Sequence, residues 1–273
     1  MGLPASVSAG SEHIPIRECN ASIINSLGGH WSAPIGFEES WLDAASIVAL
    51  QPRADEVMRE FASAAVWAWK DPRSCFTFPF WRARIEGDPI VVISYRHPLE
   101  VAASLTKRNG FGVAHGLAMW EHYNRSLLRN AQGLRTIVVA YDDLTRDPVS
   151  TLASVHRQFS GFGVALLGTP EDAALGIQTS QRHHVVDVVP PDVLLPSQLE
   201  LWQRLQHLTT PWESFAMPDL RPIHPSSVEV LLQRAAALKC QDLNLALKLR
   251  SRSRRSALRT LLGRVDHSPQ GDV

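Results

Sequence analysis

The sequence feature that most constrains the fold is an apolar run that ends in a charged turn. Residues 90–95 read IVVISY, with Gly87-Asp88-Pro89 before them and Arg96-His97-Pro98 after them. A short, apolar and β-branched run is typical of a strand buried on both faces of a parallel sheet, because such a strand loses its polar–apolar alternation. Pro98 suits the first turn of a helix, where its missing N–H needs no partner. The stretch therefore predicts a buried strand followed directly by a helix.

Two further runs have the same character. Residues 136–141 (TIVVAY) predict a second buried strand, and a helix with Pro148 in its first turn is predicted over 148–159. Residues 65–69 (AVWAW) are short and aromatic, and they predict a strand that leads straight into Lys70-Asp71-Pro72-Arg73. Alternating strands and helices indicate an α/β chain with three layers, in which helices cover both faces of a parallel sheet.

The remaining chain is predicted to be mostly helical. Helices are expected over residues 17–27, 40–50, 54–64, 113–131, 196–208 and 226–249, whereas 161–196, which carries Gln181-Arg182-His183-His184, is expected to be irregular. The predicted organisation is a loose leader at 1–16, an α/β domain at 17–210 and a helical extension with a basic tail at 211–273.

Composition excludes several classes of protein. The 273 residues carry a formal net charge of zero, so no overall field favours nucleic acid. Cys19, Cys75 and Cys240 are widely scattered, which fits neither a disulfide framework nor a metal site and favours a reducing cytoplasm. No apolar run is long enough to predict a transmembrane segment. The Arg-rich tail at 248–264 is either an amphipathic helix for an anionic surface or a solvated helix with a frayed end.

Charged residues follow all three predicted strands. Because open α/β sheets bind ligands at the carboxyl ends of their strands, these residues are expected to share one crevice. Arg96 at a strand tip, with Ser104 two turns into the next helix, is a plausible clamp for a phosphate. The alternative is an arginine paired with a nearby carboxylate and a serine packed on its helix. The expected crevice residues are Lys70, Asp71, Arg73, Arg96, Tyr141, Asp142 and Asp143.

Taken together, four stretches resemble the sulfotransferases that use 3′-phosphoadenosine-5′-phosphosulfate (PAPS). They are NSLGGHW at 25–31, WAWKDPR at 67–73, RHPLEVAASLTKR at 96–108 and VVAYDDLTRDP at 138–148, where Asp142 replaces the usual Glu. The resemblance is to the bacterial branch with a Lys-Asp-Pro-Arg box and covers about residues 17–210. It implies a P-loop-hydrolase-like fold and transfer of a sulfuryl group from PAPS, a donor co-substrate, to an acceptor hydroxyl without a metal.

The resemblance also implies roles for single residues. Arg96 and Ser104 would hold the 3′-phosphate of the donor, and Lys70 would face the phosphosulfate bridge. Arg73 would contact the same anion, and Tyr141 would join the cofactor-binding residues. Sulfuryl transfer, like phosphoryl transfer, requires in-line positioning and cations on the bridging and equatorial oxygens, which agrees with these assignments.

For the acceptor, the resemblance assigns Asp71 to orienting or deprotonating the attacking hydroxyl. The aromatic residues at 76–81 are compatible with a carbohydrate or a hydrophobic alcohol as acceptor, and with ordinary core packing. The partners expected are therefore PAPS, its product adenosine 3′,5′-bisphosphate and an unidentified hydroxyl compound.

One part of the family pattern is missing. The family opens with a strand and a Ser-Gly-Thr loop that cradle the 5′-phosphosulfate, and nothing similar precedes residue 17. We therefore expect the first strand and the P-loop to be absent or atypical, with weak nucleotide binding and poor or no transfer. The alternative function is a non-catalytic remnant of the fold that binds a nucleotide or a protein. A nucleotide kinase is a third alternative, weakened because its G-x-x-x-x-G-K-[ST] loop is not found.

Overall fold

The computed structural model describes residues 12–177 and 193–262. The chain divides into two compact units, one that extends to Leu232 and one that starts at Gln233. Helix α11 (Pro225–Leu262) begins in the first unit and makes up the described part of the second. The α/β unit that positions the candidate site is the first one. None of the described helices combines the length and the apolar character needed to cross a bilayer.

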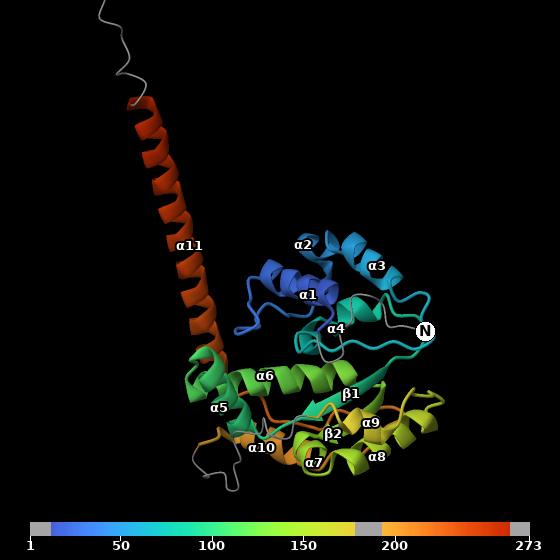
Figure 1. Ribbon diagram of the computed structural model, residues 1–273. Helices are drawn as coiled ribbons and strands as arrows, with labels where there is room; N and C mark the ends of the chain where they lie inside the picture. The colour runs from blue at the N-terminus through green and yellow to red at the C-terminus, as the bar shows by residue number, and fades with distance from the viewer. Residues whose placement is uncertain (1–11, 178–192, 263–273) are drawn as a thin grey trace, which may run out of the picture. The chain divides into compact units, whose positions relative to one another are not determined.

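A two-stranded parallel sheet lies at the centre of the first unit (Figure 1). Strand β1 (Ile90–Tyr95) pairs with β2 (Arg135–Ala140) in register along its whole length, from Ile90 opposite Arg135 to Tyr95 opposite Ala140. Both predicted strands exist, and β2 is buried as predicted. Strand β1 is only partly buried, because Ile93 is 0% exposed whereas Val92 is 46% exposed. On its outer edge β2 is bridged once more, between Thr136 and Trp212. The protein is thus an α/β protein with a small parallel sheet.

The strand predicted at 65–69 is wrong. These residues have neither helical nor strand structure, and the chain stays irregular until helix α4 (Ser74–Arg82) begins. A strand exists only where a neighbour satisfies its backbone N–H and C=O groups. Within the described ranges, no segment pairs with 65–69 and no second strand pairs with β1. The apolar composition of AVWAW is instead used in packing, since Trp67 and Trp69 stack on each other at 5.3 Å between ring centroids.

Helices α5 (Pro98–Asn109) and α6 (Val113–Ala131) connect the two strands and pack closely together. The N-terminus of α5 is capped by His97, whose Nδ1 accepts a hydrogen bond from the Leu99 backbone N–H. Its C-terminus is capped by Gly110 at φ 69°, a left-handed conformation that favours glycine. A Cβ on Gly116 of α6 would lie 2.8 Å from the Ala102 Cα of α5, so this glycine permits the close approach.

The N-terminal helices form one layer beside α6. They are α1 (Ile14–Ser26), the 3-10 turn η1 (Trp41–Asp43), α2 (Ala45–Val48), α3 (Gln51–Arg59) and α4. Their shared core is apolar and aromatic, and it includes Ile16, Ile23, Ile47, Phe80 and Trp81, each at most 2% exposed. Helix α4 packs on α6, and α6 packs on β1, so this layer covers one side of the sheet (Figure 1).

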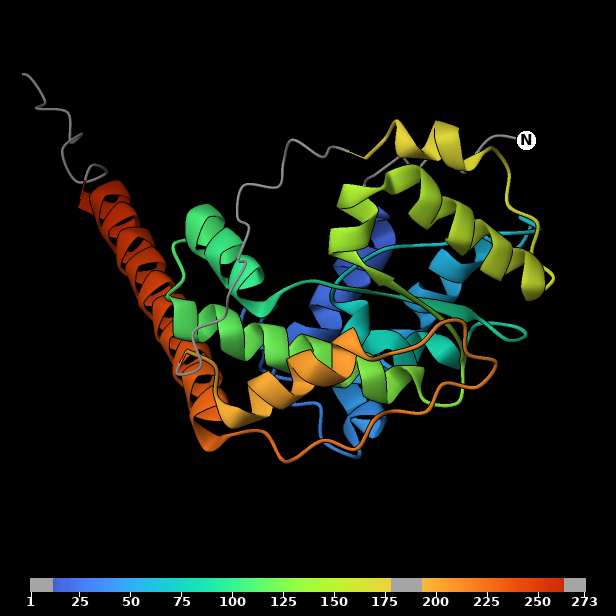
Figure 2. The same cartoon turned by 90° about the horizontal axis from the view of Figure 1, so that it is seen from below.

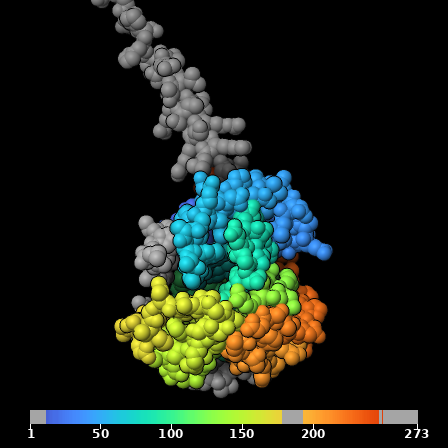
Figure 3. Space-filling view, turned by 90° about the vertical axis from the view of Figure 1, so that its right-hand side faces the viewer, coloured from blue at the N-terminus to red at the C-terminus, as the bar shows by residue number. Residues whose placement is uncertain are grey.

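The chain after β2 supplies the other helices. These are α7 (Tyr141–Arg146), α8 (Pro148–Gly161), α9 (Pro170–Ala174) and α10 (Pro196–Gln206). Helix α8 packs on β2, whereas α10 packs on α6 and lies apart from α8 (Figure 2). The core between strands, α6 and α10 contains Ile93, Leu128, Leu201, Leu205 and Phe215, all fully buried. The space-filling view shows the surface hollowed between the cyan segment that precedes α4 and the yellow helices α8 and α9 (Figure 3).

Candidate functional site

A pocket of about 460 Å³ lies at the carboxyl end of β1. It is bounded by the turn before α4, by α5 and by α6, and three arginines from different elements line it. We call it the arginine pocket, and the lining residues that matter below are Glu12, Trp31, Arg73, Arg96, Arg108 and Tyr123. Its size lies in the range of small-molecule sites, and its combination of cations with aromatic rings suits an anionic ligand with a flat apolar part.

Arg96 follows β1 directly, as predicted, and lines the pocket with its side chain 21% exposed. Its Nε donates to Oε2 of Glu100 at 2.8 Å, one turn along α5, and its guanidinium lies 4.4 Å from the ring centroid of Tyr141. These two contacts fix the guanidinium between a carboxylate and an aromatic face. Among the described residues no hydrogen bond uses its two terminal nitrogens, which leaves them for a ligand in the pocket.

Arg73 reaches the same pocket from the turn before α4. Its Nη1 donates to Oδ1 of Asp71 at 2.8 Å, and the backbone N–H of Arg73 donates to the same oxygen at 3.0 Å. The Asp71 carboxylate is almost fully buried, with 1% of the side chain exposed. The short bond from Nη1 to a buried carboxylate orients the guanidinium, and the backbone bond to the same oxygen fixes the carboxylate.

Asp71 is itself held by Asn20 of α1. The Asn20 Nδ2 donates to Oδ2 of Asp71 at 2.9 Å, and its Oδ1 accepts from Thr77 Oγ1 at 2.6 Å and from Trp81 Nε1 at 2.7 Å. Asn20 is 0% exposed and joins α1, the 70–73 turn and α4 in one buried network. Asp71 is therefore a buried structural carboxylate, which disfavours the predicted contact with an acceptor hydroxyl.

Lys70 lies beside the pocket and touches it through Glu12. Its Nζ is 3.5 Å from Oε1 of Glu12, while Arg73 Nη1 is 3.5 Å from Oε2 of the same carboxylate. The Lys70 side chain is 70% exposed, and Glu12 lines the arginine pocket. One carboxylate thus bridges two of the cations that the sequence assigned to the phosphosulfate group.

The rest of the pocket wall comes from α5, α6 and the loop after α1. Arg108 lies on the same face of α5 as Val101 and Leu105, which also line the pocket. Tyr123 donates from its hydroxyl to the carbonyl oxygen of Trp31 at 2.7 Å, and burial raises its pKa, so that it stays a neutral phenol. Trp31 and Tyr123 supply a rigid aromatic wall next to the three guanidinium groups.

Ser104 and Tyr141 take positions that differ from the expected ones. Ser104 is half-buried on α5 and does not line the arginine pocket. Tyr141 opens α7 and supports Arg96 from behind through its ring. Among the lining residues Arg96 is accompanied by Arg108 and not by Ser104, and the clamp of Arg96 and Ser104 stays a prediction.

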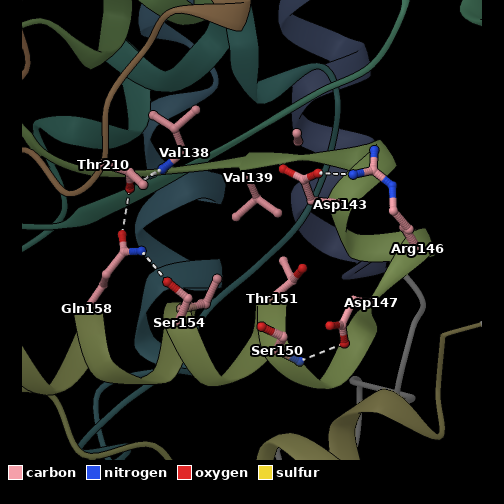
Figure 4. A pocket seen from close by; sticks show the side chains of 12 residues that line it. Val138, Val139, Asp143, Arg146, Asp147, Ser150, Thr151, Ser154, Gln158 and Thr210 are labelled. Atoms are coloured by element: carbon pink, nitrogen blue, oxygen red, sulfur yellow. Dashed lines mark hydrogen bonds and ion pairs between the residues drawn. The ribbon is translucent and has the colours of Figure 1, made fainter.

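Asp143 lies in a different pocket, so the single crevice expected for all strand tips is wrong. This second pocket, of about 360 Å³, lies between β2 and α8 (Figure 4). Its polar groups satisfy one another: Thr210 donates to Gln158, Gln158 donates to Ser154, and Asp143 pairs with Arg146 at 3.4 Å. The arrangement offers a ligand few unused polar groups.

The site contains three important residues that the sequence did not reveal. Arg108 was detectable, because its spacing from Val101 and Leu105 places all three on one helix face. Asn20 and Glu12 were not, since their partners are 51 and more residues away along the chain. Residues 181–184, which belong to the segment expected to be irregular, lie outside the described part of the chain.

Comparisons with known proteins found no matching family model, no similar curated protein and no similar solved structure. In the ranges that the structure describes, no group of three or more His, Cys, Asp or Glu residues has the geometry to hold a metal ion. The argument for function therefore depends on the arginine pocket and on the sequence motifs.

Proposed function

We propose that this protein binds PAPS in the arginine pocket and acts in transfer of its sulfuryl group to an acceptor hydroxyl. The observation that carries the proposal is the convergence of Arg73, Arg96 and Arg108 on one pocket with an aromatic wall. Guanidinium groups bind phosphate and sulfate oxygens through paired N–H donors, and three of them offset part of the charge of a nucleotide with two anionic ends.

The proposal assigns each part of the donor to a part of the pocket. Arg96 and Arg108 bind the 3′-phosphate at the β1–α5 side, and the adenine ring stacks on the aromatic wall that includes Trp31. Lys70 and Arg73 face the anionic group at the 5′ end, where positive charge stabilises the leaving phosphate. We propose further that this site belongs to a three-layer fold like that of the sulfotransferases.

Asp71 has an orienting role in this scheme. Its carboxylate is 1% exposed and already accepts hydrogen bonds from Arg73 and Asn20. A general base must come within hydrogen-bond distance of the hydroxyl that it deprotonates, and the buried Asp71 has no such access. Its contribution is to fix Arg73 against the 5′ end of the donor.

The same burial of Asp71 favours a second candidate function, a non-catalytic protein that binds the nucleotide in the same pocket. Both candidates require nucleotide binding, and they differ only in transfer. A protein with donor-binding arginines but no accessible base near Lys70 would bind adenosine 3′,5′-bisphosphate without moving a sulfuryl group.

Two measurements test the proposal. Isothermal titration calorimetry with adenosine 3′,5′-bisphosphate should show binding that Arg96→Ala weakens about 10- to 100-fold, since hydrogen bonds to charged groups contribute roughly 1.5–3 kcal/mol. The control is Arg157→Ala, which removes an exposed arginine of α8 that lines neither pocket. Transfer of labelled sulfate from PAPS to a panel of sugars and alcohols then separates enzyme from binder. Equal affinity of wild type and Arg96→Ala would refute the proposed site.

A further inference from the structure

Among the described residues that line the arginine pocket, Glu12 is the one acidic side chain. Its two carboxylate oxygens lie 3.5 Å from Lys70 Nζ and 3.5 Å from Arg73 Nη1. A carboxylate that bridges two cations in an otherwise basic pocket takes the position where a ligand anion would bind them.

We propose that Glu12 is a built-in competitor of the anionic ligand, which must displace this carboxylate from Lys70 and Arg73 in order to bind. This inference rests on the proposed function, because it concerns the same pocket. It adds a regulatory feature. In the free protein the Glu12 carboxylate occupies the 5′ side of the pocket, so the pocket binds anions more weakly than it would without Glu12.

The geometry indicates which of the two carboxylates on Arg73 yields to a ligand. Asp71 contacts Arg73 at 2.8 Å with 1% of its side chain exposed, whereas Glu12 contacts it at 3.5 Å with 25% exposed. Charge-assisted N–H···O bonds are typically about 2.7–2.9 Å long, so the Glu12 contact is a loose ion pair. Glu12 is thus the more loosely held of the two carboxylates, and a ligand group with two negative charges attracts Arg73 and Lys70 more strongly than its single charge does.

The exposure of Lys70 also indicates that Glu12, and not Asp71, is the carboxylate that a ligand displaces. Its side chain is 70% exposed, so the ion pair with Glu12 is screened by water and salt on the side of the lysine. Asp71, by contrast, is locked by Asn20 inside the buried network. The pocket therefore combines Arg73, which Asp71 holds in place, with the Glu12 carboxylate, which a ligand anion can displace.

The test measures the affinity for adenosine 3′,5′-bisphosphate by calorimetry at low salt in full-length variants. Glu12→Gln removes the charge and should bind about fivefold more tightly, because a competing pair of about 1 kcal/mol is lost. Glu18→Gln is the matched control: it removes the same charge from α1, where Glu18 pairs with Arg53 outside the pocket at 2.7 Å. This control should change the affinity less than about twofold, because the Glu18 charge is exposed to water, whose high dielectric constant weakens its field at the pocket.

A third variant separates direct occupancy from a general effect of charge. Glu12→Asp keeps the negative charge but shortens the side chain by one methylene, which withdraws the carboxylate from the two cations. Direct competition predicts that Glu12→Asp also binds more tightly than wild type. Unchanged affinity in Glu12→Asp together with a gain in Glu12→Gln would overturn the inference in favour of a field effect.

The remaining outcomes distinguish this inference from the proposed function. If wild type binds, Arg96→Ala loses binding and Glu12→Gln equals wild type, the competitor role is refuted and the proposed site stands. If neither wild type nor Glu12→Gln binds the nucleotide, while thermal unfolding shows both to be folded, the proposed function fails and the competitor role fails with it.

Discussion

Two segments of this protein have nearly the same sequence pattern and different structures. Residues 65–69 and 90–95 are both apolar runs, and each is followed by a cation and, two residues after that cation, by a proline. Only the second run forms a strand, β1, because β2 pairs with it from end to end. None of the residues 65–69 is buried, and in β1 Val92 is 46% exposed. The comparison teaches that apolar composition alone sets neither burial nor strand formation, since a strand also needs a partner elsewhere in the chain.

The two segments also fix their arginines by different means. Arg96 follows a strand whose backbone is held by β2, and Trp120 Nε1 donates to its carbonyl oxygen at 3.1 Å. Arg73 follows an irregular segment and depends on side chains, through Asp71 and Asn20. Both guanidinium groups nevertheless line the same pocket. The buried network of Asp71 and Asn20 thus positions Arg73, whereas the pairing of β1 with β2 positions Arg96.

The most damaging change to this arrangement should be Asn20→Ala. It leaves the buried Trp81 Nε1 and one oxygen of Asp71 without a partner, whereas Thr77 Oγ1 keeps its bond to the Arg73 carbonyl oxygen at 3.2 Å. Unsatisfied buried groups cost about 1–3 kcal/mol each. We expect the free energy of unfolding to fall by about 4 kcal/mol, measured by urea denaturation.

The control for that change is Asn25→Ala, an exposed asparagine on the same helix, which should stay within about 0.5 kcal/mol of wild type. A loss as small as that in Asn20→Ala would show that the 70–73 turn does not depend on this network.

The next largest effect separates the two apolar runs directly. Ile93 of β1 is 0% exposed in the core with Leu128 and Phe215, so Ile93→Ala should cost about 3 kcal/mol. Val66 in the irregular run is 57% exposed, so Val66→Ala should cost less than about 0.5 kcal/mol. Denaturant unfolding of both variants measures the difference. Equal costs would mean that the irregular run is buried as deeply as the strand.

A smaller effect concerns pH at the start of α5. Burial lowers the pKa of His97, whose Nδ1 must stay unprotonated to accept from Leu99. The unfolded chain therefore takes up a proton more readily than the folded one. The contribution of His97 to the free energy of unfolding is therefore complete above the ordinary histidine pKa of about 6.5 and decreases as the pH falls below it.

His97→Asn keeps a capping side chain and removes this titration. We expect the free energy of unfolding to depend less on pH between about 6.5 and 5 than in wild type. The difference cannot exceed about 1.4 kcal/mol per pH unit, the slope of a single proton. Part of the slope should persist, because burial also lowers the pKa of His122. Identical slopes in the two proteins would contradict a buried, neutral cap.

Much of the fold followed from local patterns. The strands at 90–95 and 136–141 and the helix at 113–131 were predictable, since their apolar spacing is set within the segment itself. Pairing is not local, which is why the sequence did not show that 65–69 lacks a partner. The helix expected to end at 249 continues to Leu262, in keeping with its Arg- and Leu-rich composition.

The candidate site divides in the same way. Arg96 and Arg73 were predictable from their motifs, and they do line one pocket. The surroundings of Asp71 were not, because its burial depends on Asn20, 51 residues earlier. The sequence analysis therefore identified Arg73 and Arg96 but not Arg108, and the burial of the Asp71 carboxylate became visible only in the three-dimensional structure.

The most direct test of the account is a double-mutant cycle on nucleotide binding with Arg73→Ala, Arg96→Ala and the double variant. If both arginines bind one ligand, each single variant should lower the calorimetric affinity for adenosine 3′,5′-bisphosphate about 10-fold or more, and the double variant should lower it further. A loss in only one of the two single variants, or in neither, would contradict a ligand site at the meeting point of the two segments.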